Sequence, residues 1–168
     1  MMFKDVHYAQ YMTEVNQRLS SNGIFLTVKG EKLNTMTIGW GFIGYMWRKP
    51  IFIVPVRKSR FTYGLIEKSD EFTVSIPFDG LKKELALCGS KSGRDIDKFK
   101  AFGLTPVDGK IVNTPVINEC DLHYECKIVF KQEMDPVNLD TAYDKSCYAN
   151  KDYHTLYFGE IVACYLKE

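Results

Sequence analysis

The sequence has almost no excess of charge of either sign. It holds 22 Lys and Arg against 21 Asp and Glu, for a net charge of +1, and its basic residues are scattered along the chain. Proteins that bind nucleic acid normally carry a basic stripe or a strong excess of Lys and Arg. The charge pattern therefore argues against nucleic acid as a partner.

Long hydrophobic runs are also missing. Residues 1–17 contain no continuous apolar segment of the kind that secretory signals have. The longest uncharged stretch, Leu33 to Trp47, is too short to span a bilayer and contains Asn, Thr and Gly. The five cysteines are odd in number and irregularly spaced, which favours reduced thiols over a disulfide scaffold. We therefore expect a cytoplasmic protein without a membrane partner.

Apolar and aromatic residues are plentiful. Hydrophobic residues make up 45% of the 168 positions, with 11 Phe and 10 Tyr among them. That is enough to bury a core without disulfides, and the aromatic side chains suit strands and large flat contacts. We find no repeat, low-complexity run or linker, so we predict a single domain over residues 1–168.

The spacing of apolar residues predicts many strands and a few short helices. Strands are expected at residues 24–29, 33–46, 51–57, 71–77, 123–132 and 154–166. Helices are expected at 6–20, 61–69, 80–87 and 95–103. A pair resembling a capping box, Ser92 and Asp95, would open the last of these helices, and Gly103 would close it. Residues 135–152 are polar and are expected to form mostly loop.

Strands without a regular βαβ alternation predict a mainly β fold, an antiparallel barrel with short helices. Residues 51–57 and 154–166 are apolar on both faces and need cover on both. A second subunit would supply that cover, so we predict a homodimer. Pro55 indicates a bulge or an edge position, because proline cannot donate to a neighbouring strand.

Two motifs suggest chemistry that their context does not support. Gly39 to Gly44 reads G-x-G-x-x-G, but a dinucleotide fingerprint needs a helix to begin there, and Pro50 blocks one. Cys120, His123 and Cys126 resemble metal ligands, but His123 would point away from the cysteines in a strand, and no fourth ligand lies beside them. We therefore predict no metal site. No elbow motif surrounds a Ser or Cys, which argues against a hydrolase.

Cations and hydroxyls gather where a predicted strand meets a short helix. Arg57, Ser59, Arg60 and Thr62 are the groups that a phosphate monoester needs, although a solvated turn with a capping Ser explains them equally well. Asn34 and Thr37 lie in an otherwise apolar strand and need partners, from another strand or from the edge of a heteroaromatic ring. Trp40 and Trp47 are expected in the core, with stacking on a ligand as the alternative.

Several longer runs together resemble one known family. The runs are NTMTIGWGFIG, KPIFIVPVRKSRFTYGLIEKSDEFTVSIP, CGSKSGRDIDKF, GLTP, HYECKIVFKQEMD and HTLYFGEIVACY. The sequence is similar to the flavin reductase-like FMN-binding family, and most of all to its flavoredoxin-like branch. The resemblance extends from about Gly23 to Tyr165.

The resemblance implies a split β-barrel homodimer with one FMN in each subunit near the interface. It assigns Asn34, Met36 and Thr37 to the ring and ribityl chain, with the backbone near Gly39 and Trp40 beside the ring. The remaining positions that it implies are Arg57, Ser59, Arg60 and Thr62 at the phosphate, Ser92 and Lys98 as further polar or cationic contacts, and His154 near the flavin or nicotinamide. A strand-end histidine bonded to the backbone is the alternative for His154.

The resemblance also implies electron transfer through the flavin, because the cofactor supplies the redox chemistry. Two forms remain open: an NADH- or NADPH-dependent reductase with a small-molecule redox substrate, and an electron carrier that receives electrons from a protein donor. Lys98 is our candidate for a cation that stabilises the anionic reduced ring. A barrel that serves as an interaction module without a cofactor is the alternative from another class. The short segment 135–152 makes an extended substrate lid doubtful.

Overall fold

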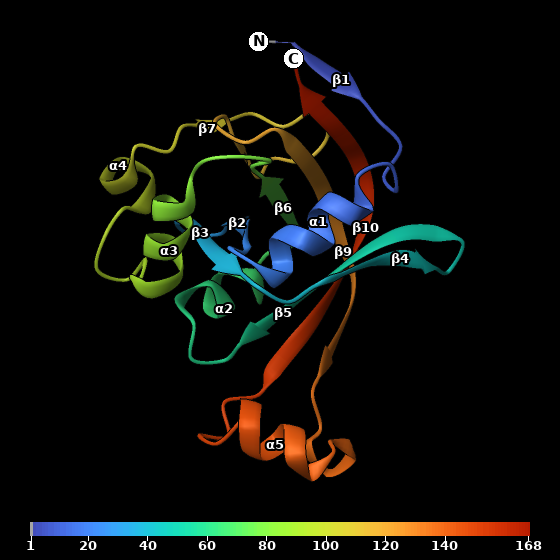
Figure 1. Cartoon of the computed structure of the whole chain (residues 1–168), viewed down its shortest axis with the longest axis vertical. Coiled ribbons are helices and arrows are strands. Elements are labelled where there is room, and N and C mark those ends of the chain that lie inside the picture. Colours follow the sequence, from blue (N-terminus) through green and yellow to red (C-terminus); the bar gives the residue numbers. More distant parts are fainter. Residues whose placement is uncertain (1) are drawn as a thin grey trace.

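The computed structural model describes residues 2–168. Its elements follow one another along the chain as strands with short helices between them (Figure 1). In order, they are β1 (Phe3–Asp5), α1 (Met12–Ser20), β2 (Ile24–Lys29), β3 (Leu33–Ile38), β4 (Phe42–Met46), β5 (Lys49–Arg57), α2 (Phe61–Ile66), β6 (Glu71–Ile76), α3 (Lys82–Ser90), α4 (Lys98–Phe102), β7 (Pro106–Val107), β8 (Val116–Ile117), β9 (Leu122–Glu133), the 3-10 turn η1 (Pro136–Asn138), α5 (Thr141–Cys147) and β10 (His154–Lys167).

One antiparallel sheet organises the molecule. Its strands follow the order β3-β2-β6-β9-β10-β5-β4, and β1 pairs with β10. Leu26 on β2 and Val54 on β5 belong to the same buried cluster although their strands lie well apart in this order, because the sheet curls around a common core. Val15 and Leu19 of α1 pack into the same cluster. The predicted antiparallel barrel with short helices is confirmed.

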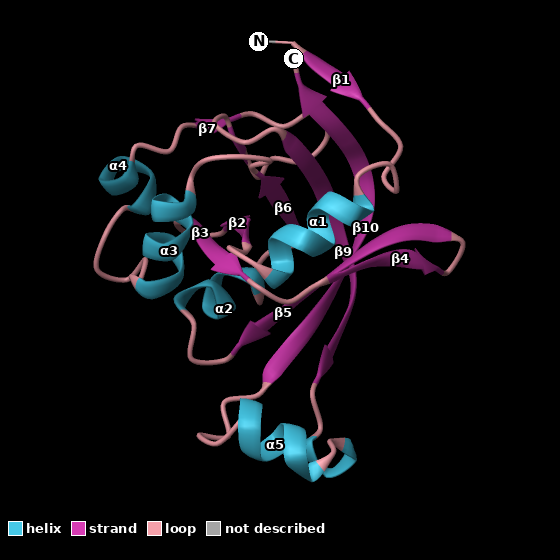
Figure 2. Ribbon diagram, in the orientation of Figure 1, coloured by secondary structure: helices cyan, strands magenta, loops and turns pink. Residues whose placement is uncertain are grey.

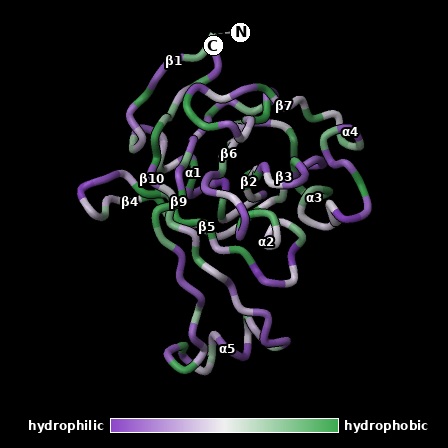
Figure 3. The backbone as a smooth tube through the Cα atoms, turned by 180° about the vertical axis from the view of Figure 1, so that it is seen from behind, coloured by the Kyte–Doolittle hydropathy of each residue, from purple (hydrophilic) through white to green (hydrophobic). Residues whose placement is uncertain are grey.

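Burial on both strand faces is achieved largely within the single chain. On β2, Leu26 faces the main core, whereas Phe25 packs against a second cluster with Leu85 of α3 and Phe99 of α4. Most of β5 is also buried, with Ile53 half-buried. Hydrophobic residues accordingly recur along the strands that meet at the centre of the molecule (Figure 3). Double-sided strands therefore do not by themselves require a second subunit, and the predicted homodimer needs separate support.

The longest strands carry a projecting segment, which we call the arm and define as residues 129–153. It contains the end of β9, then η1 and α5, and α5 lies by itself at the far end (Figures 1 and 2). The pairing of β9 and β10 shifts register between Phe158 and Gly159. A Cβ on Gly159 would lie 2.5 Å from Cζ of Phe72, so only glycine fits at this bend.

Two short helices differ from the sequence-based prediction. Residues 135–152 are not mostly loop, because Asp140 accepts a hydrogen bond from the Ala142 N–H at 2.8 Å and caps α5. The helix expected after Ser92 begins instead at Lys98, where Asp97 accepts from two backbone N–H groups. The side chain of Ser92 accepts from the Arg94 N–H in a turn, so the predicted capping box is wrong. Gly103 does close α4, in the left-handed region at φ 68°.

Other boundaries move by a few residues. The helix expected at 6–20 begins at Met12, and the extended segment 33–46 divides at residues 39–41 into β3 and β4. Pro55 lies beyond Ile53, the last residue of β5 that pairs with β4, so its edge position is confirmed. In the described part of the chain, no helix has the length and apolar character needed to cross a membrane.

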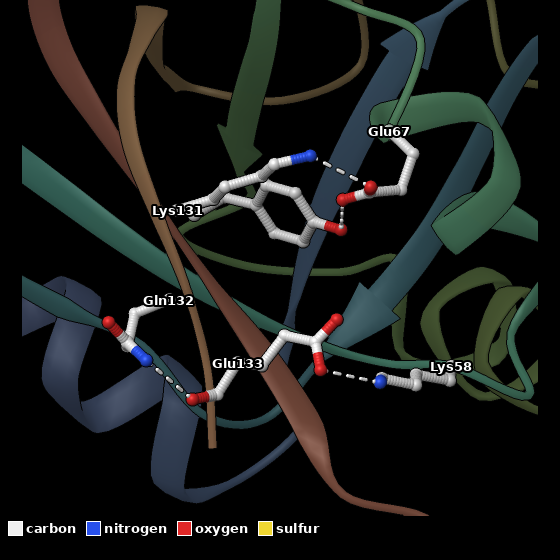
Figure 4. A network of polar contacts seen from close by, with 6 residues as sticks. Lys58, Glu67, Lys131, Gln132 and Glu133 are labelled. Atoms are coloured by element: carbon white, nitrogen blue, oxygen red, sulfur yellow. Dashed lines mark hydrogen bonds and ion pairs between the residues drawn. The ribbon is translucent and has the colours of Figure 1, made fainter. Parts of the chain in front are cut away.

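Surface ion pairs connect α2 and the turn before it to the arm (Figure 4). Lys58 pairs with Glu133, and Glu67 with Lys131, both at 2.8 Å. The Tyr157 hydroxyl donates to Glu67 at 2.6 Å. Exposed pairs of this kind contribute only about 0–1 kcal/mol each. Their main consequence is geometric, since they align residues 57–67 with the end of β9.

Candidate functional site

The structure brings together all the residues that the sequence analysis assigned to a cofactor site. They line two adjoining hollows, of about 190 Å³ and 130 Å³, which share Met36 and Arg60. We call these the first and second hollow. From the predicted set, the first contains Met36, Thr37, Gly39, Trp40, Arg57, Arg60 and His154, and the second contains Asn34, Met36, Ser59, Arg60, Thr62, Ser92 and Lys98. The binding role of each residue stays a prediction.

Local structure explains why these distant segments meet. The antiparallel register of β5 and β10 places His154 directly opposite Arg57. Arg60 is the N-cap residue of α2, and Lys98 follows the capping Asp97 at the start of α4. Contacts of β3 with α2, α3 and α4 then bring these helices to one edge strand of the sheet.

The second hollow holds a buried cation without a carboxylate partner. Lys98 is 4% exposed, and its ammonium donates to the Cys88 carbonyl at 2.7 Å. Within residues 2–168, neither Lys98 nor Arg60 forms an ion pair. Burial lowers the pKa of Lys98, and the charge of Arg60 lowers it further. Buried charges are normally paired, so this hollow is suited to an anion.

The uncharged side of the site is formed by β3. The Asn34 amide donates to the Thr62 hydroxyl at 2.9 Å, and both residues are buried. The Thr37 hydroxyl donates to the Leu85 carbonyl at 2.6 Å. These polar groups therefore find partners in α2 and α3 rather than in a neighbouring strand. A Cβ on Gly93 would collide with Oδ1 of Asn34, so glycine lets the loop after α3 pack on β3.

The arm uses donors that the sequence analysis assigned to a phosphate. The Arg57 guanidinium donates to the carbonyls of Cys147 at 2.9 Å and Asp152 at 3.1 Å. The Ser59 hydroxyl donates to the Asp152 carboxylate at 2.5 Å. Arg57 and Ser59 thus join the arm to the site. Arg60 and Lys98 line the second hollow without an ion pair in the described chain, as do Lys91 and Arg94.

His154 meets a tyrosine that sequence reasoning missed. The ring is 7% exposed, and its Nδ1 lies 2.7 Å from the Tyr148 hydroxyl rather than on a backbone group. Burial lowers the pKa of His154 to about 4, helped by Arg57 and Arg60 and opposed by Asp152. The imidazole is therefore neutral at physiological pH. Tyr148 lay in the segment expected to be loop, although the Asp140 cap before it signalled a helix.

The other histidine that the sequence singled out lies outside both hollows. His123 is fully buried, and its Nδ1 lies 3.1 Å from the Ser75 hydroxyl. Burial lowers the pKa of His123 to about 4. Cys120 and Cys126 belong to different buried clusters. Over residues 2–168 no group of three or more His, Cys, Asp or Glu side chains is arranged to hold a metal ion.

Comparison with known proteins identifies the family. The chain matches the model of the flavin reductase like domain over residues 17–168. It belongs to the flavin reductase-like family. The family resemblance predicted from the sequence is therefore confirmed. In this member of the family, residues of β3 line both hollows.

Solved structures agree with this family and with its fold. Flavoredoxin of Desulfovibrio vulgaris (Miyazaki F) is 26% identical with a TM-score of 0.69, over 87% of this chain and 69% of that chain. An FMN-binding protein from Thermus thermophilus is also 26% identical, with a TM-score of 0.68, over 87% of this chain and 71% of that chain.

A protein of Shewanella frigidimarina with a split barrel domain is 17% identical with a TM-score of 0.70, over 97% of this chain and 76% of that chain. That likeness concerns the fold alone, and the predicted split barrel is confirmed. The family and the neighbours at 26% identity together support a flavin-related redox function and place the chain among oxidoreductase-like proteins.

Proposed function

We propose that this protein binds FMN and uses it as an oxidoreductase that takes electrons from NADH or NADPH. The observation that carries the proposal is the second hollow, where the buried ammonium of Lys98 and the guanidinium of Arg60 face no carboxylate in the described chain. It adjoins a hollow lined by uncharged residues of β3. A cationic hollow beside one with a largely uncharged wall, to which Arg57 and Arg60 add charge at one side, fits a flat ring that carries a phosphate monoester.

The residues present fit the chemistry of this cofactor. Arg60 and Lys98 would hold the phosphate, with the hydroxyls of Thr62 and Ser92 as further donors, while the Ser59 hydroxyl stays bound to Asp152. Met36, Thr37 and the backbone near Gly39 would line the ring, and Trp40 and His154 would border the space for a nicotinamide. The flavin, when bound, would accept a hydride and pass electrons to free flavin, a protein or another substrate. The protein would bind it, orient it and exclude water.

An anaerobic titration tests this function. The purified protein is mixed with FMN, and binding is followed by quenching of flavin fluorescence; NADH or NADPH is then added while absorbance is recorded. We expect binding followed by loss of the oxidised flavin spectrum. Failure to bind FMN would contradict the proposal and favour an interaction module without a cofactor.

An electron carrier is the second candidate function. The likeness to flavoredoxin at 26% identity favours it. The same titration separates the two candidates. Bound FMN that neither nicotinamide nucleotide reduces, but that a chemical reductant does reduce, would support the carrier that receives electrons from a protein donor.

We also propose that the protein is a homodimer. Large hydrophobic side chains are exposed on β4 and the turn that follows it, where Phe42 is 61%, Tyr45 67% and Trp47 52% exposed. β4 is an edge strand, and Trp40, which lines the first hollow, is 46% exposed beside it. Contiguous exposed apolar residues mark contact surfaces, and a self-complementary contact with a second copy would cover them next to the site.

The oligomeric state is measurable directly. We expect light scattering after size exclusion to give twice the chain mass, and the double variant Tyr45→Glu with Trp47→Glu to give a monomer, because two carboxylates would be buried at the contact. Tyr143→Glu is the control, since Tyr143 is 64% exposed on α5, away from β4. A wild-type protein of single-chain mass at the concentrations used for flavin titration would contradict the homodimer.

A further inference from the structure

One ring nitrogen of His154 forms a hydrogen bond with Tyr148, and the other has no partner in the described chain. Nδ1 lies 2.7 Å from the Tyr148 hydroxyl, and the two residues are 7% and 3% exposed. Within the described chain, Nε2 of His154 has no hydrogen-bond partner. It is nevertheless not fully buried, because it is not among the buried polar side-chain atoms without a partner. Because His154 lines the first hollow, Nε2 is accessible from that side.

The surroundings determine which partner donates in this bond. A phenol has a single proton to donate, and within residues 2–168 the Tyr148 hydroxyl has no other hydrogen-bond partner. If Nδ1 were the donor, the phenolic proton would be buried without an acceptor, which is unfavourable. Tyr148 therefore donates and Nδ1 accepts. Since the ring is neutral, its one proton is on Nε2.

Tyr148 is itself held from two sides. Its backbone N–H donates to the Asp144 carbonyl at 3.0 Å at the end of α5, and its ring stacks on Tyr153 with centroids 5.0 Å apart. The Arg57 guanidinium lies 5.0 Å from the ring centroid while donating to the Cys147 carbonyl. The same cation also faces His154 across the register and disfavours a charged imidazole. The orientation of the phenol is therefore defined by the arm.

We propose that Tyr148 is a positioning residue that holds His154 as the neutral Nε2–H tautomer, so that this N–H donates to a carbonyl oxygen of the molecule bound in the first hollow. The ligand class is a carboxamide or a ring carbonyl, since these present an acceptor to a neutral donor. Naming this ligand class depends on the proposed function, because nicotinamide carries a carboxamide and the flavin ring carries carbonyls. The tautomer itself depends only on the contacts within the chain.

Nuclear magnetic resonance tests the tautomer without any flavin. Protein with 15N-labelled histidine is compared at neutral pH as wild type, Tyr148→Phe and Tyr143→Phe, with His154→Gln to assign the signals. We expect protonated Nε2 and bare Nδ1 in the wild type, a mixture of tautomers in Tyr148→Phe, and no change in Tyr143→Phe, whose tyrosine is exposed on α5, the helix that ends just before Tyr148. A proton on Nδ1 in the wild type, or an unchanged ring in Tyr148→Phe, would overturn the proposal.

Kinetics tests the donor role separately. For anaerobic reduction of bound FMN, we expect Tyr148→Phe to raise KM for the nicotinamide nucleotide about tenfold with a smaller change in kcat, and Tyr143→Phe to match the wild type. An unchanged KM with a weaker affinity for FMN in Tyr148→Phe would assign the acceptor to the flavin ring carbonyl. Equal KM and equal FMN affinity in Tyr148→Phe and the wild type would overturn the donor role. If the protein reduces no FMN at all, the proposed function is contradicted. The tautomer is still tested independently, because the magnetic resonance experiment uses no flavin.

Discussion

Replacement of Lys98 by Met is expected to lower the affinity for FMN about 100-fold. Methionine keeps most of the volume but removes the buried ammonium. As far as residues 2–168 show, Arg60, Lys91 and Arg94 remain as cations without an ion pair in the lining of the second hollow. A hydrogen bond to a charged group contributes about 1.5–3 kcal/mol, which corresponds to a factor of roughly 10–150 in binding. Fluorescence titration of the purified variant measures the loss.

Lys100→Met is the matched control for this substitution. Lys100 lies on the same helix, its side chain is 88% exposed, and its only ion pair in the described chain is a loose one of 3.8 Å with Asp97. We expect FMN affinity to stay within about twofold of the wild type. Urea unfolding of both variants shows whether a lost affinity reflects lost folding. An unchanged dissociation constant in Lys98→Met would remove Lys98 from the site.

Riboflavin distinguishes the two anions that Lys98 could meet. If the ammonium binds the phosphate, Lys98→Met should weaken FMN and leave riboflavin, which has no phosphate, unchanged. If it stabilises the anionic reduced ring, the reduced forms of both flavins should bind less tightly and the reduction potential of the bound flavin should fall. The neighbours of Lys98 in the second hollow, Ser59, Arg60, Thr62 and Ser92, favour the phosphate.

Acid is expected to destabilise the fold between pH 6.5 and pH 4, well before most carboxylates are protonated. Burial lowers the pKa of His123 and of His154 to about 4 in the folded protein, against an ordinary value of 6.5. In this window the unfolded chain binds more protons than the folded one, so the free energy of unfolding rises with pH. Each histidine accounts for up to about 3 kcal/mol, a large part of a total stability of about 5–15 kcal/mol.

Urea unfolding at several pH values measures this dependence. We expect the stability to be complete above pH 6.5 and to be lost progressively as the pH falls toward 4. His123→Asn keeps an amide near Ser75 but cannot take up the proton, so its stability should depend less on pH in the same window. His7→Asn, at an exposed histidine, should keep the wild-type slope. Parallel curves for the wild type and His123→Asn would show that His123 does not drive acid unfolding.

Residues whose own charge or polarity indicates a binding role could be identified before the fold was known. Arg60 was selected because cations next to hydroxyls suit a phosphate, and Asn34 and Thr37 because polar groups in an apolar strand need partners. Lys98 was selected as a cationic contact through the family resemblance. All four line the two hollows. Strand periodicity likewise predicted the sheet, because alternate side chains face alternate sides whatever the strand pairs with.

Residues that act through a distant partner could not be identified in this way. Tyr148 and Asp152 belong to the arm, and neither carries a local signal of contact with His154 or Ser59. Arg57 was assigned to the phosphate from its neighbours in sequence, whereas its guanidinium donates to carbonyls of the arm. Those contacts depend on where a long hairpin ends in space, which the spacing of residues does not encode.

The amino-acid sequence by itself determined the mainly β class, the family, and the chemical character of the site, because period, composition and charge are local properties of the chain. Only the tertiary structure decided which of these groups remain free for a ligand. The pairing of β5 with β10 places His154 opposite Arg57, and the arm then engages Arg57 while Lys98 stays buried without a carboxylate beside it. The role of a charged group depends on the groups within a few ångströms of it, and the fold determines which groups those are.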